Sequence, residues 1–135
     1  MQLKFIQDKI YEIRDRKVML DKDLAFLYEV PTKSLNLSVK RNTERFPGDF
    51  MFRITKTEYD NLRFQIETSK RGGTRYMPYA FTELGVAMLS SILNSKKAIQ
   101  VNIAIMRAFV FLRETSLQQK ELTEKIALLE HKYNK

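Results

Sequence analysis

The sequence predicts a compact, helix-rich α+β domain with a helix-turn-helix-like pair, a small β-sheet or wing, and a C-terminal amphipathic helix. Its 135 residues fit one domain, and 44% hydrophobic residues are enough to build a buried core. Apolar residues recur mostly at helical spacing, with a few short runs of strand type between them. We expect residues 1–114 to form the domain and residues 115–135 to form a separate amphipathic segment.

The N-terminal stretch allows two interpretations. Apolar residues from Leu3 to Ile13 follow helical spacing, whereas the runs 11–13 and 18–20, on either side of the polar residues 14–17, are typical of a small hairpin. We expect the hairpin for the second part of this stretch.

Two short helices are predicted on either side of Pro31. Asp21 is a good N-cap for the first, which must end near Glu29 because proline steers the residue before it away from the helical conformation. Thr32 is placed to cap the second helix. Glu29 occupies the turn, where a glycine would be expected.

The second helix is predicted to have one packed face and one basic face. Leu35, Val39 and Asn42 share the side that packs. The opposite side carries Lys33, Asn36, Leu37, Lys40 and Arg41. Two short helices with the second one cationic outward match the arrangement that places a helix in the DNA major groove. The alternative is a structural helical hairpin with a solvated face.

The charge distribution also favours a polyanionic partner. The formal net charge is +8 with a pI near 9.7, and residues 33–75 alone carry ten Lys and Arg against five Asp and Glu. Charge by itself allows either nucleic acid or an acidic membrane face. No apolar run is long enough to span a membrane and no signal peptide is apparent, so we expect a cytoplasmic protein.

A wing is predicted beyond the helical pair. Phe50 to Ile54 suits a buried strand, Thr55 to Glu58 forms a capping box that opens another helix, and Tyr76 to Phe81 suits a second strand. Between them lies a basic, glycine-containing loop that would approach phosphates with Lys70, Arg71 and Arg75. An ordinary surface loop is the alternative.

The C-terminal third is predicted to be helical. Thr82 and Glu83 start one helix, and Ser95 caps the next, which is apolar nearly all round as a central core helix should be. Thr115 can cap the chain again. Beyond it a stripe with 4-3-4 spacing is expected to pair with a second copy of the chain, through Leu122, Ile126, Leu129 and Tyr133.

Enzyme chemistry is disfavoured. The chain has no Cys and a single His, His131, so we expect no cysteine-based zinc site, no other metal site and no cofactor. Gly72 and Gly73 lack the surroundings of a nucleotide-binding loop, and Ser90 and Ser91 have no base partner. We expect the protein not to be an enzyme.

Four blocks of the sequence carry a resemblance to a known family: Val18 to Val30, Val39 to Thr55, Gly72 to Leu93 and Ala98 to Glu114. Taken in order, they resemble the KilA-N and Bro-N superfamily of phage and viral DNA-binding domains. The resemblance is strongest to the branch named for the N-terminal domain of a viral sixth open reading frame, often found in antirepressor-type proteins of prophages and mobile elements. Glu29 and Leu84 depart from the usual Gly and Gln, and Glu29 can alter the turn.

This resemblance implies a compact α+β domain that binds specific double-stranded DNA in a transcriptional regulator or antirepressor. Asn36 and Arg41 suit base edges, because Asn pairs bidentately with adenine and Arg with guanine. A homodimer is expected. The alternative is an interaction module whose basic face grips an acidic repressor or host protein. The residues expected to bind DNA are Lys33, Ser34, Asn36, Lys40, Arg41, Lys70, Arg71 and Arg75.

Overall fold

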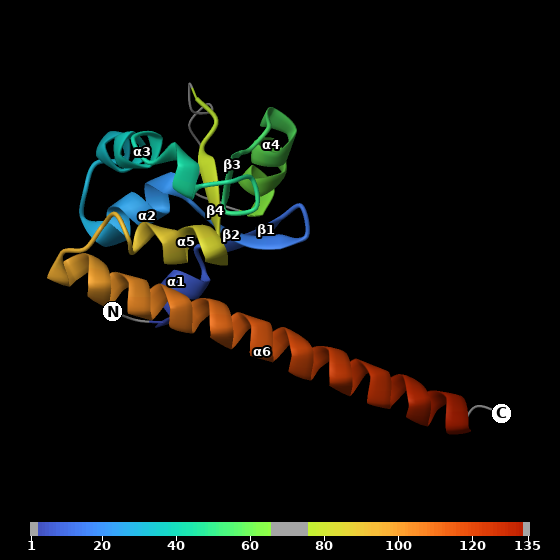
Figure 1. The fold of residues 1–135 in the computed structure, drawn as a ribbon. Helices are drawn as coiled ribbons and strands as arrows, with labels where there is room; N and C mark the ends of the chain where they lie inside the picture. The colour runs from blue at the N-terminus through green and yellow to red at the C-terminus, as the bar shows by residue number, and fades with distance from the viewer. Residues whose placement is uncertain (1–2, 66–75, 134–135) are drawn as a thin grey trace.

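A four-stranded antiparallel sheet in the order β1-β2-β4-β3 forms the centre of the molecule (Figure 1). The computed structural model describes residues 3–65 and 76–133. Mixed helices and sheet confirm the α+β class. The strands are β1 (Ile10–Ile13), β2 (Arg16–Leu20), β3 (Met51–Arg53) and β4 (Tyr79–Thr82).

The predicted N-terminal hairpin is confirmed, and a short helix precedes it. β1 and β2 pair directly across a two-residue turn, with Ile13 opposite Arg16. Arg14 and Asp15 in the turn have φ angles of 55° and 59°, as the tight turns that match strand twist require. The Arg14 guanidinium lies 4.2 Å from the ring centre of Phe52 and so fixes the turn against β3.

Both faces of the sheet are buried, because successive side chains of a strand point to opposite faces. In β2, Met19 joins the larger core while Val18 and Leu20 join the smaller one. In β4, Phe81 and Ala80 divide in the same way. This explains why strands that read as continuous apolar runs lie at the centre of a mixed fold.

Helices cover the two faces unequally. α4 covers the smaller core, and the other helices pack on the larger core, with α6 along the base of the body (Figure 1). A 3-10 turn at Thr43–Arg45 follows α3. The helices are α1 (Leu3–Gln7), α2 (Asp21–Tyr28), α3 (Thr32–Lys40), α4 (Lys56–Gln65), α5 (Glu83–Leu89) and α6 (Lys96–Tyr133).

Several predicted helix starts are confirmed. The Thr55 hydroxyl accepts from the Glu58 amide at 3.1 Å and the Glu58 carboxylate accepts from the Thr55 amide at 2.8 Å, which is the reciprocal capping box. The hydroxyl of Thr82 accepts from the Gly85 amide, and that of Ser95 accepts from the Ala98 amide.

Two predicted caps are wrong. Asp21 and Thr32 are the first residues of their helices, and the N-cap positions belong to Leu20 and Pro31. Neither Leu20 nor Pro31 has a side-chain oxygen that could accept a hydrogen bond from the first helical amides. Extended backbone at Pro31 starts α3 directly, since its fixed φ is compatible with that position. The Asp21 carboxylate therefore does not cap α2 and instead accepts hydrogen bonds from α3 and β4.

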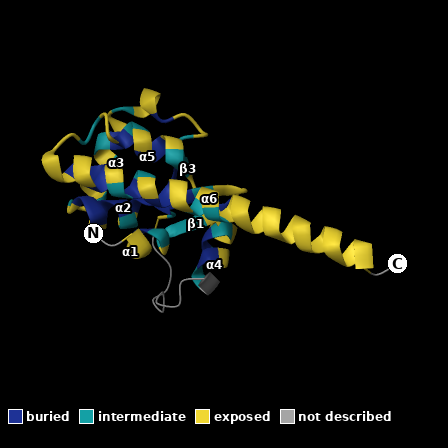
Figure 2. Ribbon diagram, turned by 90° about the horizontal axis from the view of Figure 1, so that it is seen from below, coloured by how far each residue is buried: buried dark blue, intermediate teal, exposed yellow. Residues whose placement is uncertain are grey.

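The C-terminal prediction needs two corrections. α6 runs without a break through Thr115, so no new cap forms there. The helix is also not buried on all sides, as a central core helix would be. Val101 and Ile105 are buried, whereas Ile99 and Ile103 on another side are about half exposed. At 1.5 Å per residue its 38 residues span roughly 57 Å, and its second half extends beyond the body (Figures 1 and 2). Of the helices in the described part of the chain, none has the length and apolar character needed to cross a bilayer.

Candidate nucleic-acid interface

The turn between α2 and α3 sets the angle of the helical pair. Glu29 ends α2 in the left-handed conformation, with φ 60° and ψ 44°. The Val30 amide then donates to the Ala25 carbonyl at 3.0 Å, which closes the end of the helix. The position thus has the geometry that favours glycine, and the chain adopts it with a glutamate.

α3 has the two faces that its sequence predicts. Leu35 and Val39 are buried, whereas Lys33, Ser34 and Lys40 are exposed, as is Arg41 after the last turn. α3 lies on the far side of α2 from α6, so the terminal helix does not cover the exposed face (Figure 1). The basic side of α3 is therefore open to a partner.

A groove of about 610 Å³ runs beside this exposed face. We call it the α3 groove. Five α3 residues form one wall: Thr32, and four residues spaced at i, i+3, i+4 and i+7 from Lys33 to Lys40. Residues of α4, β3 and the segment leading into β4 form the other wall. The lining residues are Asp21, Lys22, Thr32, Lys33, Asn36, Leu37, Lys40, Arg53, Tyr59, Tyr76, Met77, Pro78 and Tyr79.

The α3 groove has an excess of positive charge. Lys22, Lys33, Lys40 and Arg53 line it, and within residues 3–65 and 76–133 none of them forms an ion pair. Its one carboxylate, Asp21, is buried. The groove thus has four cations and a single carboxylate, which already accepts hydrogen bonds from within the protein. Its net positive charge attracts negatively charged groups.

Asp21 holds the two walls of the groove together. One carboxylate oxygen accepts from the Lys22 amide at 2.7 Å. The other accepts from the Asn36 side chain at 2.9 Å and from the Tyr79 amide at 3.3 Å. This single side chain therefore ties α3 to β4.

Asn36 is consequently placed differently from the base reader that the sequence suggests. Its amide nitrogen donates to Asp21, and its side-chain oxygen is buried without a hydrogen-bond partner among the described residues. A bidentate contact with adenine needs both of these atoms accessible. In this conformation Asn36 positions α3 and does not present an adenine-reading edge.

Arg53 is a lining residue of the α3 groove that the sequence did not reveal. It lies opposite Tyr79 in the β3–β4 pairing, with its guanidinium carbon 4.6 Å from the ring centre, and it donates to the Tyr79 hydroxyl at 2.7 Å. Stacking of this kind orients an arginine while its remaining donors stay available. The strand register places Arg53 opposite Tyr79, and both residues line the α3 groove together with residues of α3.

The predicted DNA-binding residues divide into three groups. Lys33, Asn36 and Lys40 line the α3 groove. Ser34 and Arg41 form an exposed strip next to the groove. Each follows a groove lysine by one residue, which is a rotation of about 100° round the helix. The predicted loop residues lie outside the described part of the chain, and they are Lys70, Arg71 and Arg75.

Two other features of the described residues bear on function. Residues 3–65 and 76–133 contain no group of three His, Cys, Asp or Glu side chains arranged to hold a metal ion. Every residue from Ser116 to Tyr133 is exposed, including the predicted pairing stripe, whose exposed fractions are 59%, 47%, 54% and 76% for Leu122, Ile126, Leu129 and Tyr133.

Comparison with known proteins identifies the family. Searches among curated proteins and among solved structures each found no match. The sequence does match the family described as the ORF6N domain, over residues 8–92. This range includes the sheet, the helical pair and the described α3 groove, and it excludes α6. Since the match covers more than half of the sequence, the chain belongs to the ORF6N domain family.

Proposed function

We propose that this protein binds double-stranded DNA with α3 and the α3 groove, as a regulatory domain of the phage type. The observation that carries the proposal is a set of cations around a groove beside an exposed helix. None of Lys22, Lys33, Lys40 and Arg53 has an ion-pair partner within the part of the chain that the structure describes. Membership of the ORF6N domain family supports a regulatory role. The B-DNA major groove is wide enough to admit one α-helix.

The arrangement suggests separate contacts for affinity and for sequence reading. Lysines and Arg53 along the α3 groove would contact the phosphates of one DNA strand. The neighbouring strip with Ser34 and Arg41 would then face the base edges, where Arg41 suits guanine. Asn36 and Asp21 fix the angle at which this strip is presented.

The test compares two double variants with equal charge. Lys33→Ala with Lys40→Ala removes two groove cations, and Lys96→Ala with Lys125→Ala removes two exposed lysines of α6. Fluorescence anisotropy with a random-sequence duplex at low salt should show at least about tenfold weaker binding for the groove variant and near wild-type binding for the α6 variant. Equal losses in the two variants would reject the α3 groove as the binding site.

We further propose that the protein is a dimer formed through the exposed half of α6. Helices in proteins derive most of their stability from packing of an apolar face. Here the stripe containing Leu122 and Ile126 has no intramolecular partner in the described structure. A two-stranded coiled coil with a second copy would cover this stripe. A dimer would also present two α3 helices to one duplex.

Sedimentation tests the dimer. The full chain should have twice the 16.0 kDa of one copy, and a chain ending at Glu114 should have the mass of a monomer. The truncated protein should stay folded, because the last buried residue of α6 is Phe109. The full-length variant Ile126→Asp should also be monomeric. Ala127→Asp, at an exposed neighbouring position off the stripe, adds the same single negative charge and is the control. A full-length protein that sediments as a monomer would remove the stripe from the account.

An interaction module for an acidic protein is the second candidate. Leu37 lines the α3 groove and is 44% exposed, and such an apolar contact suits a protein surface. Wild-type protein that fails to retard a random duplex at low salt would favour this candidate over DNA binding.

A further inference from the structure

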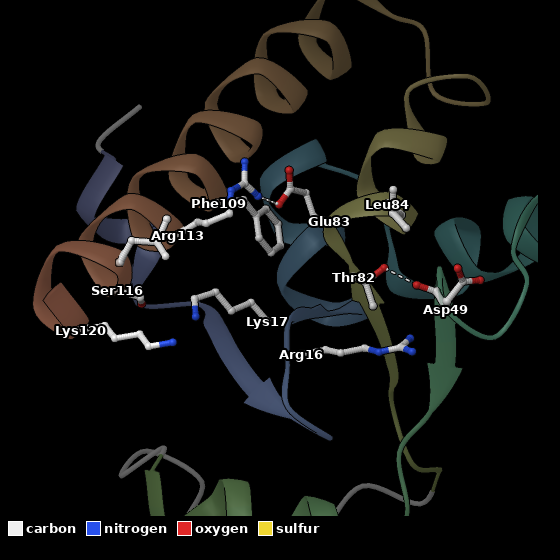
Figure 3. A pocket seen from close by; sticks show the side chains of 11 residues that line it. Arg16, Lys17, Asp49, Thr82, Glu83, Leu84, Phe109, Arg113, Ser116 and Lys120 are labelled. Atoms are coloured by element: carbon white, nitrogen blue, oxygen red, sulfur yellow. Dashed lines mark hydrogen bonds and ion pairs between the residues drawn. The ribbon is translucent and has the colours of Figure 1, made fainter. Parts of the chain in front are cut away.

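A second hollow lies on a different side of the molecule, where α6 leaves the body. It has a volume of about 560 Å³, within the range of small-molecule sites. Residues of β2, the start of α5 and the middle of α6 line it (Figure 3). The hollow and the α3 groove share no lining residue, so the hollow is separate from the proposed DNA-binding surface.

The floor and sides of this hollow are mainly apolar. The ring of Phe109 forms its floor, and Leu84 and Leu117 line its sides while remaining 52% and 55% exposed. Apolar side chains that are half exposed around one hollow gain from being covered by an apolar group.

Two ammonium groups face each other at one end of the hollow. Lys17 extends from β2 and Lys120 from α6, with their nitrogen ends directed toward one another and Ser116 beside them (Figure 3). Neither lysine has a hydrogen-bond or ion-pair partner among the described residues. By contrast, Arg113 in the same hollow is neutralised by Glu83, whose carboxylate accepts its hydrogen bond at 2.5 Å.

We propose that this hollow binds an amphipathic organic anion, such as a medium-chain carboxylate. The carboxylate would lie between Lys17 and Lys120 and accept from the Ser116 hydroxyl, because an anion there relieves the repulsion of two like charges. The hydrocarbon tail would cover Leu84, Leu117 and the ring of Phe109. The two lysines at one end of the hollow and the apolar side chains along it therefore favour the two ends of the same ligand.

Such a ligand would join the body to the emerging half of α6. Lys17 and Leu84 belong to the body, whereas Ser116, Leu117 and Lys120 belong to the exposed half of the helix. Lys120 and Leu122 point about 200° apart round α6, so a bound ligand leaves the proposed pairing stripe uncovered. Ligand binding should accordingly slow hydrogen exchange of the α6 amides near Ser116 without changing the oligomeric state.

Amide chemical-shift titrations of the full chain with three probes test the proposal. Octanoate supplies a tail and a charge, 1-octanol supplies the tail alone, and inorganic phosphate supplies charge alone. Octanoate should produce saturable shifts at Lys17, Leu84 and residues 113–120, and the other two probes should bind roughly tenfold more weakly or not at all.

Two variants with equal charge locate the carboxylate. Lys17→Gln with Lys120→Gln should weaken octanoate binding by roughly tenfold while leaving 1-octanol binding unchanged. Lys125→Gln with Lys132→Gln, on exposed α6 positions outside the hollow, should bind octanoate as the wild type does. The proposal is overturned if no probe gives saturable shifts, if octanol binds as well as octanoate, or if the two variants behave alike.

Discussion

Asp23 is a carboxylate in an environment that opposes its charge. Burial raises its pKa above the ordinary value and the neighbouring Asp21 raises it further, while Lys9 and Lys22 act in the opposite direction. One of its oxygens is buried without a hydrogen-bond partner among the described residues. The folded state therefore binds a proton at Asp23 more tightly than the unfolded chain does.

This raised pKa predicts a pH-dependent effect of Asp23→Asn. Above the folded-state pKa the wild-type carboxylate is charged and lowers stability, so the variant should have the higher melting temperature at pH 7. As pH falls through the folded-state pKa toward the unfolded value near 3.9, wild-type Asp23 becomes protonated and the difference should disappear.

Thermal unfolding followed by circular dichroism at pH 7 and pH 3 measures this difference. The exposed Asp8→Asn variant controls for the loss of one negative charge. An Asp23→Asn advantage that is the same at both pH values would contradict the assigned cause.

At the scale of elements, α5 is pressed against the loop before β3. A Cβ atom added to Gly85 would lie 1.9 Å from the Phe50 carbonyl oxygen. That oxygen is held in place, since it accepts from the Thr82 amide at 3.0 Å. Only glycine allows this close approach of two backbones.

Gly85→Ala should therefore destabilise the domain by about 1–3 kcal/mol or more, because backbone must move to admit the methyl group. Gly48→Ala is the matched control, since a Cβ there meets nothing within 4 Å. Urea unfolding of both variants gives the free energies of unfolding. Similar free energies of unfolding for Gly85→Ala and Gly48→Ala would contradict this prediction, because they would show that the loop containing Phe50 moves at little energetic cost.

The elements that sequence predicts well are those specified by neighbouring residues. The hairpin, the capping box at Thr55 and the end of α2 at Glu29 all depend on short-range patterns. The roles of Asp21 and Arg53 depend instead on partners 58 and 26 residues away, and no local pattern records those contacts. The half-exposed Ile99 and Ile103 show the same limit, because apolar periodicity identifies a helix without showing which side packs.

Across the whole molecule, the proposed functions occupy separate surfaces. The α3 groove lies on the side of the body away from α6, and the exposed half of α6 extends past the sheet (Figure 1). The helix that would join two copies thus leaves both α3 faces accessible. A dimer could place two such faces on one duplex at once. Linking the two faces raises the affinity of the dimer for DNA, although the contacts of each face stay the same.

The most direct test of DNA binding through the α3 groove is the salt dependence of affinity for a random duplex, from about 50 to 200 mM KCl. One phosphate contact for each of the four groove cations predicts a slope of log affinity against log salt of roughly −3 to −4. Lys33→Ala with Lys40→Ala should make this slope shallower by about 2, one unit for each lost phosphate contact. No binding by the wild type at 50 mM salt, or an unchanged slope in the variant, would contradict the account.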